Sequence, residues 1–151
     1  MTSQAQINAD SQKIFEALTH GVAGDDETAW NLLGPIVQRS DLAMYATFCT
    51  IAEAAAFDAI QQQGPGNFVI EVEHLDTGAE GSVDVLPPSL RFAAQFVTAR
   101  ANRDEDTTDA LYRALYQSGP DELGTGLRAL YEMAVVSLRA FCERKREAEG
   151  R

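Results

Sequence analysis

A weak internal repeat constrains the fold of this sequence more than any other feature. Residues 14–60, shifted by 79 positions, align with residues 93–139, and seven of the 47 aligned pairs are identical, including Asp25 with Asp104 and Glu53 with Glu132. Both copies show the same order of patterns, namely a helix, an acidic turn, a second helix, a short break and a longer third helix. The sequence therefore predicts a mainly α fold of about six helices in two pseudo-repeated three-helix halves.

Apolar residues at spacings of three and four support each of these helices. The last helix, beginning near Asp121, carries the longest such stripe: Leu123, Leu127, Leu130, Ala134, Leu138 and Phe141. In the first half, the alanine-rich run 52–56 favours close packing against another helix. Polar residues that can cap helices set several expected starts: Asn8 or Asp10 for the first helix, Ser40 or Asp41 for the third and Ser89 for the fourth. The fifth helix is expected over about Thr108 to Gln117.

The connector between the halves, residues 64–88, differs in character from the rest of the chain. Gly64-Pro65-Gly66 ends the third helix, and residues 68–73 and 82–86 are rich in β-branched residues with partial alternation. We interpret this pattern as a short β-hairpin, with an extended connector as the alternative. Isolated hairpins are marginally stable, so these strands are expected to lie against the helices or to pair with another chain.

Size and composition fit one helical domain over residues 1–151. The chain has 45% hydrophobic and 23% charged residues, which is typical of folded proteins. Cys49 and Cys142 fall inside helical patterns and are expected to be free thiols. Residues 1–12 lack a signal-peptide pattern, and no apolar run approaches the about 20 residues of a membrane span. We therefore expect a cytoplasmic location.

The net charge of −11 lies entirely in the first part of the chain. Residues 1–90 hold 13 acids and two bases, whereas residues 91–151 hold ten of each. An acidic surface repels phosphate backbones, so direct nucleic-acid binding is disfavoured. The same surface favours a basic protein partner, although solubility alone also accounts for it.

Few residues in the sequence suggest a catalytic, metal-binding or ligand-binding role. Glu53 and Glu132 recur at matching places in the two long helices and are the best candidates for acid–base work or metal binding. The only histidines are His20 and His74, so the Glu-x-x-His pairs of carboxylate metal sites are absent. We assign no catalytic residues, metal or cofactor. Trp30 and Tyr131, together with Glu53 and Glu132, are the candidate ligand-binding residues.

Three functions remain open on this basis. The first is a noncatalytic interaction module, expected to be a homodimer whose acidic N-terminal half faces a basic partner. The second is a small-molecule-binding helical regulatory protein with a pocket between the two halves, near Trp30 and Tyr131. The third is a metal-dependent hydrolase that uses Glu53 and Glu132.

Overall fold

A computed structural model describes residues 3–63, 72–73, 80–81 and 86–150 of this chain. Within these residues the chain is mainly helical, as the repeat and the apolar periodicity predicted. The six helices are α1 (Gln4–Val22), α2 (Asp26–Arg39), α3 (Asp41–Gln63), α4 (Pro88–Ala101), α5 (Glu105–Ser118) and α6 (Pro120–Glu149). Two short strands, β1 (Val72–Glu73) and β2 (Glu80–Gly81), pair in antiparallel fashion between α3 and α4.

Short polar side chains set where several helices begin. The Asp25 carboxylate accepts a hydrogen bond from the Thr28 N–H at 3.2 Å, and the Asp104 carboxylate accepts one from the Thr107 N–H at 3.1 Å. Hydrogen bonds from the side chain and the backbone of these threonines hold the pKa of both aspartates below its usual value. The Ser40 hydroxyl caps α3 by accepting from the Ala43 N–H at 3.1 Å.

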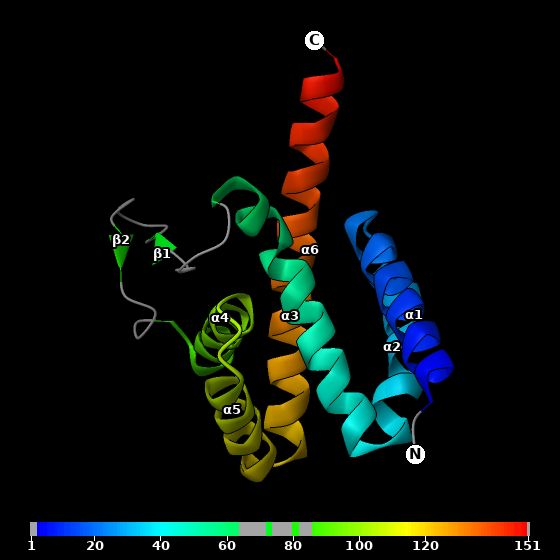
Figure 1. The fold of residues 1–151 in the computed structure, drawn as a ribbon, viewed down its shortest axis with the longest axis vertical. Coiled ribbons are helices and arrows are strands. Elements are labelled where there is room, and N and C mark those ends of the chain that lie inside the picture. Colours follow the sequence, from blue (N-terminus) through cyan, green and yellow to red (C-terminus); the bar gives the residue numbers. More distant parts are fainter. Residues whose placement is uncertain (1–2, 64–71, 74–79, 82–85, 151) are drawn as a thin grey trace.

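Helices α3 and α6 form the centre of the molecule, with α1 and α2 on one side and α4 and α5 on the other (Figure 1). Contacts between α3 and α6 advance in the same direction along both helices, so the two helices are parallel. Ser137 Oγ donates to the Ala55 carbonyl at 2.7 Å, the Phe57 and Phe141 rings lie 5.7 Å apart, and Arg144 forms an ion pair with Asp58. Beyond these contacts α6 projects past the other helices (Figure 1).

The hydrophobic core lies where α3 and α6 meet the flanking helices. Phe48, Ile51 and Leu130 are fully buried there, as is the small face formed by Ala52 and Ala56. Helix α3 packs against α6 over much of its length, and the small residues of the alanine-rich run are buried between helices. The Phe48 ring meets Phe92 and Phe96 edge-on, with ring centroids 6.0 Å apart in both pairs.

Several predicted helix starts were wrong. Helix α1 begins at Gln4 rather than near Asn8 or Asp10, because the Ser3 hydroxyl accepts from the Gln6 N–H and caps the helix earlier. Helix α4 begins at Pro88, without a side-chain cap from Ser89, because proline suits the first helical position. Helix α5 begins at Glu105, three residues before Thr108, because Asp104 caps it.

Most of the predicted hairpin lies outside the described residues. What is described is the ladder in which Val72 pairs with Gly81 and Glu73 with Glu80. Among the described helices, none combines the length and apolar character that crossing a membrane requires. Cys49 and Cys142 are both free and half-buried, as predicted.

Candidate functional site

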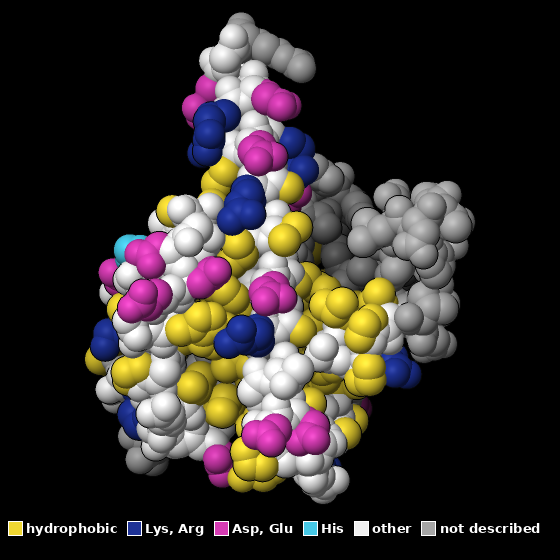
Figure 2. Space-filling model, turned by 180° about the vertical axis from the view of Figure 1, so that it is seen from behind, with side chains coloured by type: hydrophobic (Ala, Val, Ile, Leu, Met, Phe, Trp, Pro, Cys, Tyr) yellow, Lys and Arg dark blue, Asp and Glu magenta, His cyan; other side chains and the backbone are white. Residues whose placement is uncertain are grey.

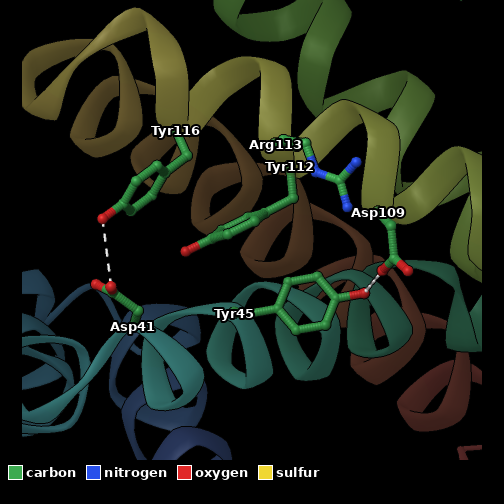
Figure 3. Close-up of a pocket in the computed structure, with 6 residues that line it drawn as sticks. All are labelled: Asp41, Tyr45, Asp109, Tyr112, Arg113 and Tyr116. Carbon is green, nitrogen blue, oxygen red and sulfur yellow. Dashed lines mark hydrogen bonds between the residues drawn. The ribbon is translucent and has the colours of Figure 1, made fainter.

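A cleft of about 360 Å³ lies between α3 and α5 and is lined almost entirely by aromatic and charged side chains (Figure 3). We call it the tyrosine cleft. Its lining residues are Asp41 and Tyr45 from α3, and Asp109, Tyr112, Arg113 and Tyr116 from α5. Because α3 and α5 belong to different halves of the sequence, the cleft depends on the tertiary fold.

Helical spacing explains why these side chains meet. Asp41 and Tyr45 are one turn apart on α3, and Asp109, Tyr112 and Tyr116 follow at spacings of three and four on α5, so each set occupies one helix face. Helix α5 packs along α4 and α6 and reaches α3 through long side chains. The cleft is the space between α3 and α5 that these side chains span.

Two tyrosine–carboxylate hydrogen bonds cross the cleft in opposite directions (Figure 3). The Tyr45 hydroxyl on α3 donates to the Asp109 carboxylate on α5, and the Tyr116 hydroxyl on α5 donates to Asp41 Oδ2 on α3 at 3.2 Å. The rings also contact one another, with Tyr45 and Tyr112 centroids 4.9 Å apart in an edge arrangement. These contacts hold the tyrosine rings in position without a ligand.

Tyr112 occupies the middle of the cleft, and its hydroxyl differs from the other two. This hydroxyl oxygen is buried and has no hydrogen-bond partner among the described residues, whereas Tyr45 and Tyr116 each donate to a carboxylate. Burial, followed by the charge of Asp41, raises the pKa of Tyr112 to about 12. Tyr112 is therefore a neutral phenol at physiological pH, with its capacity to donate and accept a hydrogen bond unused.

The seam between α3 and α4 continues from the cleft through Cys49 to Glu53. Burial raises the pKa of the Cys49 thiol, against the smaller opposing effect of nearby Arg100. A thiol held neutral in this way is a poor nucleophile. Arg100 forms an ion pair with Glu53 at the far end of this seam.

The structure brings Trp30 and Tyr131 together between α2 and α6. Their ring centroids are 4.8 Å apart, the Tyr131 hydroxyl donates to Asp26 at 2.7 Å, and the Arg128 guanidinium lies 5.9 Å from the indole centroid. Burial, reinforced by the Asp26 hydrogen bond, raises the pKa of Tyr131. The two rings contact each other directly. The ligand-binding role predicted for Trp30 and Tyr131 stays a prediction.

Glu53 and Glu132 lie in different surroundings. Glu53 is paired with Arg100 of α4, whereas Glu132 is exposed on α6. Within the described part of the chain, no group of three or more histidine, cysteine and carboxylate side chains is arranged to hold a metal ion. The hydrolase hypothesis for these two glutamates stays a prediction.

Sequence reasoning missed every residue of the tyrosine cleft. Tyr45 fits the apolar stripe of α3, and Asp41 fits a helix cap, so neither stands out as a binding residue. A usable signal was the second line of aromatics on α5, where Tyr112 and Tyr116 stand one turn apart beside the acidic Asp109. Comparisons of this chain with protein-family models, with curated proteins and with solved structures found no match.

Proposed function

We propose that this protein is a noncatalytic small-molecule-binding protein and that the tyrosine cleft takes a small organic cation. The observation that carries the proposal is the buried Tyr112 hydroxyl, which has no hydrogen-bond partner among the described residues and lies between two tyrosine–carboxylate pairs. A buried polar group without a hydrogen bond costs free energy, and a bound ligand that supplies the partner recovers it. The proposal keeps the small-molecule-binding function that the sequence left open. The proposed binding site lies between α3 and α5 rather than near Trp30 and Tyr131.

The charges and rings of the cleft favour a cation. Two carboxylates, Asp41 and Asp109, line it against one guanidinium, Arg113, and each carboxylate has acceptor capacity beyond its tyrosine hydrogen bond. Aromatic faces attract ammonium and guanidinium groups through their quadrupoles. The chain as a whole carries a net charge of −11, which raises the local concentration of cations. A volume of about 360 Å³ suits a small organic amine.

We also infer that the two halves are related by the repeat and are joined by a hairpin connector. Helices α2 and α5 begin and end 79 residues apart, and their capping aspartates, Asp25 and Asp104, have the same spacing. The β1–β2 pairing supports the hairpin.

In the alignment of the two halves, Trp30 corresponds to Asp109. An indole at that position fills the space between α2 and α6, whereas a carboxylate leaves the space between α3 and α5 open.

The proposal is tested by calorimetric titration with benzylammonium and methylammonium, whose N–H groups can donate to the Tyr112 hydroxyl. We expect the Asp109→Asn variant to weaken binding of the better cation about tenfold, or about 1.4 kcal/mol, because it removes the charge but keeps an acceptor for Tyr45. Asp106→Asn is the matched control, since Asp106 lies on the same helix, is exposed and does not line the cleft. Equal affinity of the Asp109→Asn variant and the unaltered protein would overturn the proposal.

A second candidate function is the noncatalytic interaction module, expected to be a homodimer. The observation that favours it is exposed apolar surface: the side chains of Leu42 and Val136 are 63% and 64% exposed. Figure 2 shows hydrophobic side chains gathered on both sides of α6, below its charged projecting end. Exposed apolar patches mark interaction surfaces. A basic partner for the acidic N-terminal half and a cytoplasmic location remain predictions.

The test of this second candidate is the solution mass by light scattering coupled to size exclusion. A dimer that dissociates in the Val136→Glu variant supports it. A species of 16.4 kDa at every concentration contradicts the homodimer.

A further inference from the structure

A second hollow, of about 430 Å³, lies where α3 meets the turn between α4 and α5. Its charged lining consists of Glu53, Arg100, Arg103 and Glu105, backed by the apolar side chains of Ala56 and Ile60. None of these residues lines the tyrosine cleft. The hollow is therefore a separate feature whose chemistry is dominated by ionic groups.

Arg103 has an unusual backbone conformation for its residue type. Its φ angle is +57°, and it is the only residue other than glycine with a positive φ in the described part of the chain. The α1–α2 turn has the same hydrogen bonds: Gly24 N–H donates to the Gly21 carbonyl at 2.9 Å, as Arg103 N–H donates to the Arg100 carbonyl at 3.1 Å. There the left-handed position is occupied by glycine, with φ of +87°. Glycine adopts this conformation without steric cost, so an arginine here is more strained than the turn requires.

Such strain is typical of positions where the side chain has a role of its own. The Arg103 side chain is exposed and forms no salt bridge with any described residue. Its guanidinium is therefore free to bind a ligand from the hollow. The N-terminus of α5 follows directly, at Glu105, and contributes the positive end of the helix dipole.

Arg100 supplies a second group with unused hydrogen-bonding capacity. One terminal nitrogen is paired with Glu53, but Nε is buried and has no hydrogen-bond partner among the described residues. A buried guanidinium N–H without an acceptor is costly, more so than a neutral donor. Glu53 is engaged by Arg100, which leaves Arg103 and Glu105 as the charged groups of the hollow without a salt bridge among the described residues.

We propose that this hollow binds a small oxyanion, the phosphate or carboxylate group of a metabolite, with Arg103 and Arg100 as its ligands. Guanidinium groups match the planar, two-oxygen geometry of these anions. Arg103 and Arg100 both line the hollow, and a bound oxyanion supplies the acceptor that Arg100 Nε lacks among the described residues. This site does not depend on the tyrosine cleft, and either can exist without the other.

The test is an NMR titration of the full chain that follows the Nε–Hε signal of Arg100, with sodium phosphate or sodium acetate added against sodium chloride at matched ionic strength. We expect a saturable shift of this signal with phosphate, acetate or both. The more effective anion then identifies the ligand group. Arg103→Gly should raise the dissociation constant at least about tenfold, which corresponds to about 1.4 kcal/mol. The melting temperature of the same variant without anion should equal or exceed that of the unaltered protein, because glycine relieves the strain.

Two further variants complete the design. Arg103→Ala should also lose anion binding but should show no gain in melting temperature, since alanine does not favour a positive φ. Arg146→Ala removes the same charge from the projecting end of α6 and should bind the anion as the unaltered protein does. Anion binding that is unchanged in the Arg103→Gly variant, or a signal that responds to phosphate and acetate no more than to chloride, overturns the proposal.

Discussion

Removing the Tyr112 hydroxyl should make the protein more stable, contrary to the usual effect of truncating a buried side chain. In the Tyr112→Phe variant the ring keeps its contacts with Tyr45 and Phe48, at 4.9 and 5.2 Å between centroids. What is lost is a buried hydroxyl that has no partner among the described residues. An unsatisfied buried group of this kind costs about 1–3 kcal/mol, so we expect a gain of about 1 kcal/mol after partial relaxation.

The neighbouring tyrosine provides a matched control for the same chemical change. Tyr45→Phe removes a hydroxyl that donates to the Asp109 carboxylate. Because this pair is partly exposed and water replaces the lost donor, we expect a loss of about 1 kcal/mol rather than more. Two single-atom deletions on adjacent rings should therefore change the free energy of unfolding in opposite directions.

The assay is urea-induced unfolding followed by far-UV circular dichroism at neutral pH. The midpoint of Tyr112→Phe should rise and that of Tyr45→Phe should fall with an unchanged slope, since neither substitution alters the area exposed on unfolding. In thermal melts the shift should be about 2–4 °C per kcal/mol for a chain of this length. If Tyr112→Phe is destabilised to the same extent as Tyr45→Phe, its hydroxyl is satisfied and the argument for a ligand at that position fails.

Three other expectations concern packing and ionisation. In Gly21→Ala the new Cβ would overlap the Tyr131 hydroxyl, which should cost about 1–3 kcal/mol, whereas Gly34→Ala meets nothing within 4 Å and should be neutral or stabilising in urea titrations. Leu130→Ala, at a fully buried position, should cost about 2–5 kcal/mol by the same assay; a smaller loss would mean that the site collapses around the cavity. The pKa of Tyr112 is raised from 10 to about 12, so ionisation of this phenol is easier in the unfolded chain and the folded state loses stability as the pH rises from 10 towards 12; alkaline urea titrations with a constant midpoint would contradict this.

Local signals in the sequence predicted the helices well. The apolar stripe through Leu127, Leu130 and Ala134 depends on residues close together in the chain, and all three positions are buried in the structure. Predicted helix starts were wrong where an earlier residue caps the helix, as at Ser3 and Asp104. Propensity indicates that a helix forms, but competition among neighbouring caps decides where it begins.

The candidate site could not be predicted in the same way, because it depends on how helices distant in sequence face one another. Periodicity placed Tyr45 on an inward face of α3 without indicating that its partner would be Asp109 of α5. Trp30 and Tyr131 were expected beside a pocket, and periodicity did not indicate that their rings would contact each other, tilted by 50° with centroids 4.8 Å apart. A helical period indicates which face is buried, but the rotation and separation of two packed helices decide whether their side chains fill the space or leave it open.

The most direct test of the central claim is an NMR titration of selectively ring-labelled tyrosines with the better-binding organic cation. The chain has four tyrosines, of which Tyr45, Tyr112 and Tyr116 line the cleft and Tyr131 packs elsewhere against Trp30. The account predicts saturable shifts of the three cleft tyrosines with one common dissociation constant, and no change at Tyr131. Unsaturable shifts, or shifts that include Tyr131 to the same extent, would contradict a binding site in the tyrosine cleft.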